Sequence, residues 1–213
     1  MAARAPLLCM RRVRTEDPRG GPMLPAMTNA TPPDLGPLAA LVGTWEGEKG
    51  MDVAPSAARD TARSPYRERM SFVPTGRVDN HEQMLFGLRY QTTAWRIGAD
   101  EPFHEELGYW LWDAARSQVM RAFLVPRGVT VLAGGTAAAD ARSFRLEAKL
   151  GEPTYGICSN PFLHEAFRTV RYELFVELLG RDSFRYTEDT VLQMPGRAEP
   201  FHHTDGNTLR RVE

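Results

Sequence analysis

The chain has few cysteines, no long apolar run and almost no net charge, and each shortage excludes a class of protein. Cys9 and Cys158 are the only cysteines, so neither a disulfide framework nor a cysteine-based zinc site can be built. No run approaches the roughly 18 apolar residues that cross a bilayer. The net charge of -1 gives no overall attraction to nucleic acid or anionic lipid. We therefore expect a small-molecule ligand, no nucleic-acid or membrane partner, and a monomer or homodimer.

The N-terminal segment differs in composition from the rest. Residues 1–34 are rich in Pro, Gly, Arg and Thr and have neither a strand nor a helix period, which predicts a disordered extension. Their short apolar patch precedes Arg11, Arg12 and Arg14, whereas a secretory signal has its basic residues before a longer apolar core. We expect a cytoplasmic protein with one folded domain over residues 35–213.

Alternating apolar and polar residues dominate that domain. In residues 143–150, Phe144, Leu146 and Ala148 point one way while charged residues point the other, which is typical of a half-buried strand. Similar patterns, separated by short turns, predict nine or ten strands: 43–48, 66–72, 81–95, 104–112, 119–125, 129–133, 143–150, 171–178, 184–192 and 201–212. Gly134-Gly135 is predicted to be a turn.

This arrangement predicts an all-β, antiparallel up-and-down barrel of about ten strands, like lipocalins and fatty-acid-binding proteins, because closure removes the sheet edges. A β-sandwich is the alternative. Asp34 can cap a short helix before the first strand. Residues 151–170 form an unusually long link, in which Asn160-Pro161 can begin a helical turn. This link is either a lid or an apolar flap over one barrel end.

Several motifs, in order along the chain, resemble the nitrobindin family of heme-binding barrels. The segment Gly43-x-Trp45-x-Gly47 is similar to that family's G-x-W-x-G signature. The most specific match is Pro102-Phe103-His104-x-Glu106-x-Gly108-Tyr109, which is similar to its P-L-H-x-E-x-G-Y segment. Further similar segments are Tyr66-x-Glu68-x-x-x-Phe72, Tyr90-Gln91-x-x-x-Trp95 and the closing His203…Leu209-Arg210-Arg211. The chain resembles a divergent member over residues 35–212.

The resemblance implies heme b, with His203 as axial ligand of the iron and Thr44 and Trp45 among the cofactor-binding residues. It also implies that ferric heme converts peroxynitrite to nitrate and binds nitric oxide, with no catalytic group beyond the iron. The alternative is a non-enzymatic barrel that carries a fatty acid or another small apolar ligand.

The last predicted strand does not settle which histidine is the iron ligand. Adjacent residues of a strand face opposite ways, so only one of His202 and His203 can point inward; His202 is the reserve ligand. The family's tail has five steps from histidine to leucine, whereas His203 and Leu209 are six apart. Either Gly206 therefore hosts a bulge, or the inward histidine is not the family's ligand. A second departure is Lys49, which stands where the family has a third glycine, with Gly50 following.

Another candidate pair lies upstream. His104 and Glu106 share one strand face. They form either a salt-linked structural pair, which we favour, or part of a second metal site.

Overall fold

The computed structural model describes residues 33–212. The predicted disordered extension, 1–34, lies outside the described residues except for its last two, so that prediction stays a prediction. Within 33–212, no helix has the length and apolarity to cross a membrane.

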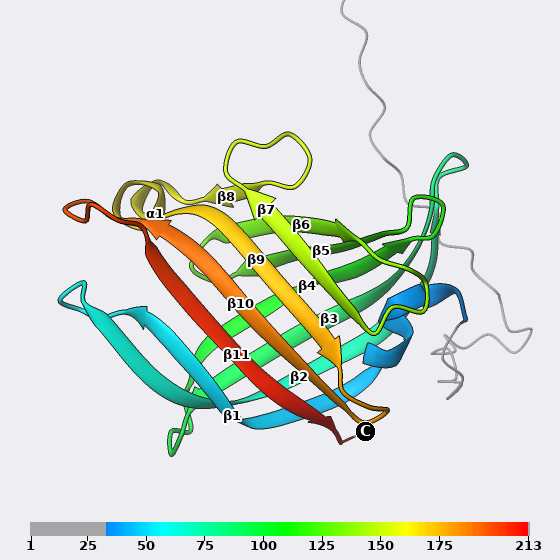
Figure 1. The fold of residues 1–213 in the computed structure, drawn as a ribbon, viewed down its shortest axis with the longest axis horizontal. Helices are drawn as coiled ribbons and strands as arrows, with labels where there is room; N and C mark the ends of the chain where they lie inside the picture. The colour runs from blue at the N-terminus through cyan, green and yellow to red at the C-terminus, as the bar shows by residue number, and fades with distance from the viewer. Residues whose placement is uncertain (1–32, 213) are drawn as a thin grey trace, which may run out of the picture.

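The strands form one closed antiparallel barrel (Figure 1), in the order β1-β2-β3-β4-β5-β6-β7-β9-β10-β11 and back to β1. This confirms the ten-stranded all-β barrel and excludes the sandwich. A short extra strand, β8, pairs with β6 alone. The strands are β1 Gly43–Pro55, β2 Thr61–Asp79, β3 Met84–Arg96, β4 Pro102–Asp113, β5 Gln118–Val125, β6 Val129–Thr136, β7 Ser143–Lys149, β8 Ile157–Ser159, β9 Arg168–Leu178, β10 Ser183–Gln193 and β11 Phe201–Arg211.

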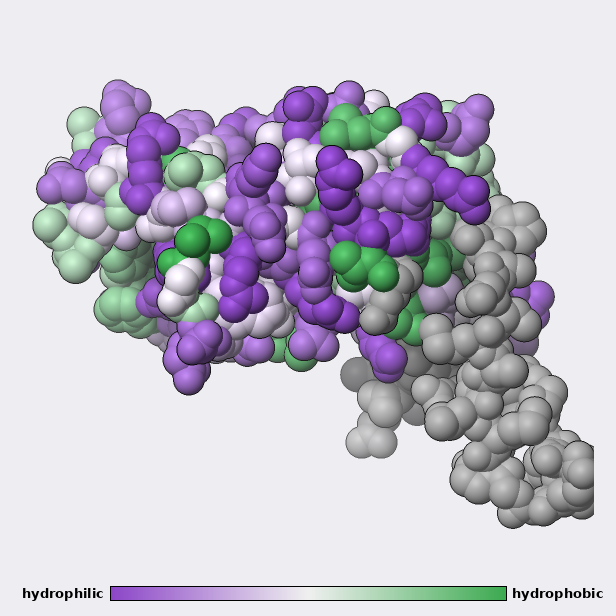
Figure 2. Space-filling model, turned by 90° about the horizontal axis from the view of Figure 1, so that it is seen from below, coloured by the Kyte–Doolittle hydropathy of each residue, from purple (hydrophilic) through white to green (hydrophobic). Residues whose placement is uncertain are grey.

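Alternation explains why these segments became barrel strands. In β7 the residues Phe144, Leu146 and Ala148 are buried while their neighbours are exposed or half-buried, and burying one face of each strand builds the core. The outer face is correspondingly polar. Seen from below, the surface is mostly hydrophilic, and hydrophobic residues occur in small separate groups (Figure 2).

The predicted turn at Gly134-Gly135 is wrong, because both glycines lie inside β6. Here β6 meets β7 through a single pair, Gly134 with Glu147. A Cβ atom on Gly135 would lie 2.0 Å from the carbonyl oxygen of Arg145. The glycines are therefore present because two backbones approach closely where the barrel closes, not because the chain turns.

Two short helices lie at opposite ends of the barrel (Figure 1). The 3-10 helix η1 (Pro33–Leu41) confirms the predicted N-terminal helix and buries Leu35, Leu38 and Leu41. The helix α1 (Pro161–Ala166) confirms the helical turn in the long link, with Asn160 Oδ1 accepting from the Leu163 N–H at 3.0 Å. We call these the η1 end and the α1 end.

The strand register is irregular in β1 rather than in β11. β11 pairs with β10 without a shift from Phe201 to Arg210, which excludes the alternative of a bulge at Gly206. Instead, β1 shifts by one residue against both neighbours between Gly47 and Gly50. This β-bulge contains Lys49, which stands where the family has a third glycine. Whether His203 corresponds to the family's ligand stays a prediction.

Candidate functional site

A cavity of about 640 Å³ occupies the barrel between η1 and α1. Its volume is within the range of small-molecule and cofactor sites. The cavity walls reach from Leu41 near η1 to Leu163 and Phe167 at the α1 end. His203 lines the cavity with its side chain 34% exposed, so solvent reaches the cavity at this end.

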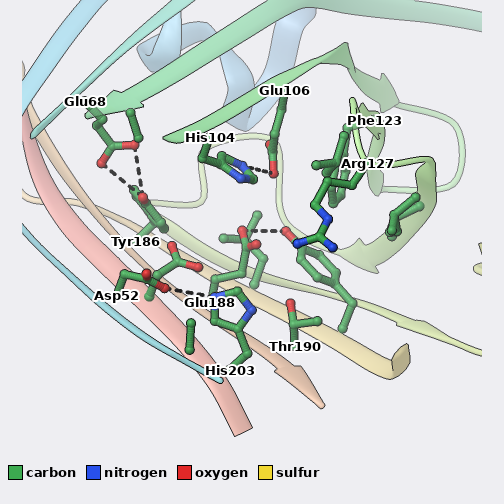
Figure 3. A pocket seen from close by; sticks show the side chains of 18 of the residues that line it. Asp52, Glu68, His104, Glu106, Phe123, Arg127, Tyr186, Glu188, Thr190 and His203 are labelled. Atoms are coloured by element: carbon green, nitrogen blue, oxygen red, sulfur yellow. Dashed lines mark hydrogen bonds and ion pairs between the residues drawn. The ribbon is translucent and has the colours of Figure 1, made fainter. Parts of the chain in front are cut away.

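His203 and Asp52 form the site's most defined pair (Figure 3). The His203 Nε2–H donates to Asp52 Oδ1 at 2.9 Å. On its other oxygen, Asp52 contacts Arg96 Nη1 at 2.8 Å. Burial works against ionisation of Asp52, but His203 and Arg96 together lower its pKa. An ionised carboxylate therefore orients the His203 ring from one side, the arrangement found around metal-bound imidazoles.

His202 faces the opposite way from His203, as strand alternation predicted. Its side chain is 58% exposed, and its Nδ1–H donates to Asp189 Oδ2 at 2.9 Å on the outer surface of the barrel. His203 and Leu209 share the inward face because six steps preserve the phase of a regular strand. His203 therefore reaches the cavity without any bulge in β11.

Thr44 and Trp45 do not line the cavity. Trp45 is 1% exposed, and its Nε1–H donates to the carbonyl oxygen of Leu41 at 2.7 Å. Its ring packs edge-on against Phe184 at the η1 end. The contact of these two residues with the cofactor stays a prediction, and in the structure Trp45 ties η1 to the barrel.

A buried arginine, Arg121, lies in the cavity wall. Arg121 is 4% exposed and contacts both Glu106 and Glu188, the latter at 2.7 Å. The phenol oxygens of Tyr90 and Tyr172 accept its other N–H groups. Burial works against ionisation of Glu106, but Arg121 overcomes it and lowers the pKa of that carboxyl to about 2. The charges are therefore paired and hydrogen-bonded, as buried ions must be.

His104 and Glu106 form the salt-linked pair that the sequence predicted. His104 Nε2 lies 3.2 Å from Glu106 Oε1 (Figure 3). Burial opposes protonation of His104, but the hydrogen bond to Glu106 raises its pKa. Within residues 33–212, no group of three or more His, Cys, Asp or Glu side chains is placed to hold a metal ion. The alternative of a second metal site has no support.

A second polar cluster joins two carboxyls through two phenols. Tyr186 OH donates to Glu68 at 3.0 Å and lies 2.7 Å from Tyr66 OH, which donates to Asp205 at 3.5 Å. Burial, supported by the nearby Glu106 and Glu188 charges, raises the pKa of Glu68 to about 7. Glu68 therefore changes protonation near neutral pH.

Sequence reasoning assigned no role to most of these polar residues. Glu68 and Glu188 occur in phase with the apolar positions of their strands, beside Met70 and Tyr186. A charged residue at an inward position is the signal that could have found them. Arg121 lies in an equally apolar strand, between Val119 and Phe123.

The fold and the site first define a class: a closed antiparallel β-barrel with a ligand-sized internal cavity and an inward histidine. The family model described as "THAP4-like, heme-binding beta-barrel domain" matches residues 34–211. The chain belongs to this family, the nitrobindin family, and the membership supports heme as its ligand.

The solved structures that share this fold include a mycobacterial protein. That structure is titled "Crystal Structure of Rv2717c from M. tuberculosis" and has a TM-score of 0.61 and 20% sequence identity. The alignment covers 86% of this chain and 100% of that chain. No curated protein matches the sequence.

Proposed function

We propose that the chain binds heme b in the barrel cavity, with His203 as the axial ligand of the iron. The observation that carries this proposal is the inward His203 ring, held on one nitrogen by the ionised Asp52. Within the described residues, its other nitrogen, Nδ1, has no hydrogen-bond partner. The pairing can be exchanged between the nitrogens by a ring flip, so either can be the one that faces a metal.

The cavity wall also suits the rest of the cofactor. Apolar side chains line it near the α1 end, including Phe123, Leu163 and Phe167, and they can cover a porphyrin ring. Arg96 and the exposed Arg127 lie in the same wall. Their guanidinium groups can bind the carboxylates of the heme. The side chains therefore fit heme: the imidazole of His203, apolar walls and cations near solvent.

For the activity, we propose peroxynitrite isomerisation at ferric heme together with reversible nitric oxide binding. When bound, heme would supply the reactive iron. The chain contributes the imidazole, the Asp52 carboxylate that orients it, and walls that restrict access. No further catalytic residue is assigned.

Reconstitution with hemin tests the ligand. The full chain, the His203→Ala variant and the His202→Ala variant are each mixed with hemin and followed by absorbance. We expect a shifted Soret band in the wild type and in His202→Ala, and a weakened or displaced band in His203→Ala. An unchanged band in His203→Ala would refute the ligand assignment. No Soret shift in any of the three would refute heme binding.

Activity is tested separately. Stopped-flow absorbance follows peroxynitrite decay with the heme-loaded wild type and with hemin-treated His203→Ala. We expect faster decay, with nitrate as product, only in the wild type. Equal rates in the two proteins would refute the proposed activity and leave heme binding intact.

A further inference from the structure

The cavity wall carries more carboxyl groups than arginines, of which there are three: Arg96, Arg121 and Arg127. Five carboxyl groups line it: Asp52, Glu68, Glu106, Glu188 and Asp205. Asp52 is paired with Arg96, and Arg121 serves both Glu106 and Glu188. Within residues 33–212, Glu68 and Asp205 form no ion pair with Lys, Arg or His. Two inward carboxyls thus lack a cation.

The strand register places these groups side by side. Asp205 of β11 lies directly opposite Asp52 of β1 on one side and Glu188 of β10 on the other. Like charges in such cross-strand positions destabilise a sheet. Glu68 joins this row through Tyr186 and Tyr66, whose hydroxyls connect it to Asp205. A positive group among these side chains would supply the cationic partner that Glu68 and Asp205 lack.

An independent observation in the same cavity is an unused donor. Trp110 is 4% exposed and lines the cavity, yet its indole Nε1 has no hydrogen-bond partner among the described residues. Buried donors are almost always satisfied, so this one points to an acceptor supplied by a ligand. The Trp110 ring lies 6.1 Å from Tyr90 and 5.9 Å from Phe72, centroid to centroid, in an aromatic part of the wall.

We propose that the barrel has an inner subsite for an organic amine, with the protonated amine at Glu68 and Asp205 and an acceptor oxygen of the same ligand at Trp110. This subsite goes beyond the proposed heme site and does not depend on it. His203 precedes Asp205 and Asn207 on the inward face of β11, and Glu68 pairs with Gly47, which is next to Asn207. The subsite therefore lies further from the α1 end than His203.

The part of the wall around Glu68, Glu106, Glu188 and Asp205 disfavours an anionic group. Arg121 is the only fully buried cation among the residues that line the cavity, and its N–H groups are used by Glu106, Glu188, Tyr90 and Tyr172. A ligand carboxylate would have to displace one of these partners while facing unpaired carboxyls. At this inner subsite a carboxylate is therefore disfavoured relative to an amine, whose charge the aromatic faces also favour.

Three probes with the same ring and differing in charge test this inference: tyramine, tyrosol and 4-hydroxyphenylacetate. Isothermal titration calorimetry with the full chain, as purified, measures each affinity at pH 8. We expect tyramine to bind roughly tenfold or more tighter than tyrosol, and 4-hydroxyphenylacetate to bind weakest. Equal or tighter binding of the acid overturns the proposal, and so does the absence of tyramine binding.

Variants locate the two contacts. Glu68→Gln should lose the roughly tenfold preference for tyramine over tyrosol, whereas Glu173→Gln, on the outer face, should keep it. Trp110→Phe should weaken tyramine but leave phenylethylamine, which lacks the hydroxyl, unchanged. Circular dichroism and melting temperature confirm that each variant is folded.

If Glu68→Gln is folded and keeps the full preference, the amine site is not at Glu68 and the proposal fails. Tyramine binding that survives while hemin binding fails would instead overturn only the heme proposal, so the two outcomes are distinguishable.

Discussion

The two halves of the barrel interior differ in the polarity of their side chains. Towards the η1 end the inward side chains are large and apolar, and several are fully buried: Leu38, Leu41, Trp45, Phe72, Leu88, Trp112, Phe184 and Leu209. Towards the α1 end the cavity wall carries carboxyls, phenols, arginines and histidines in addition to apolar side chains. Burial of apolar surface stabilises the first half, while the second is held by paired charges. We infer that the η1 end mainly stabilises the fold and that the α1 end mainly binds the ligand.

The largest effect is expected from removing the central cation. Arg121→Met leaves Glu106 and Glu188 buried without their partner and should cost about 5 kcal/mol of unfolding free energy. In the wild type, the lowered pKa of Glu106 means that its contribution is present above its unfolded pKa and is lost as pH falls towards about 2.

In the variant, burial still raises the pKa of Glu106, and of the groups that oppose it only His104 and Tyr90 remain. The pKa of Glu106 should therefore rise above its wild-type value, and the loss of stability should be greater at pH 8 than at pH 4. Urea unfolding at both pH values measures this. Equal losses at the two values would contradict the charge pairing. Arg145→Met, described below, is the matched control.

A slightly smaller loss is expected at the apolar end. Trp45→Ala removes a side chain that is 1% exposed and should cost about 4 kcal/mol. Because Trp45 does not line the cavity, hemin affinity should stay within about twofold of wild type in the protein that remains folded. Thermal unfolding and hemin titration check the two parts. A folded variant that no longer binds hemin would contradict the separation of stability and binding between the two ends.

A gain in stability is expected from Glu68→Gln. The pKa of Glu68 is raised from 4.5 to about 7, so folding binds a proton and stability falls as pH rises from the unfolded value through about 7. At about 1.36 kcal/mol per pKa unit, the cost at pH 8 is about 3 kcal/mol. The variant should remove it, with little change at pH 4. Chemical denaturation against pH measures this, and parallel wild-type and variant profiles would contradict it.

The smallest effect is expected outside the barrel. Arg145 pairs with Glu173 at 2.6 Å, but the arginine side chain is 63% exposed. Arg145→Met should change unfolding free energy by less than about 1 kcal/mol, which the same urea experiment measures. A loss approaching that of Arg121→Met would show that surface charges matter as much as those in the cavity.

Most of the fold followed from the strand period, because inward positions such as Phe144 and Leu146 must be apolar to fill a core. Alternation also predicted that only one of His202 and His203 points inward, whereas the choice of His203 came from the family resemblance. What sequence reasoning could not give was pairing between distant strands. Asp52 contacts His203 across 151 positions of sequence, and Arg121 joins Glu188 from 67 positions away. Those contacts depend on how the barrel closes and on its register.

The bulge in β1 has a consequence for how this site can change. Before it, odd-numbered residues such as Trp45 and Gly47 are buried; after it, even-numbered Gly50 and Asp52 are. Deleting one residue at 48–49 would turn Asp52 outward and bring Met51 and Val53 towards the cavity. A change in the length of β1 can thus replace the carboxylate beside His203 by apolar side chains without substituting any residue of the site.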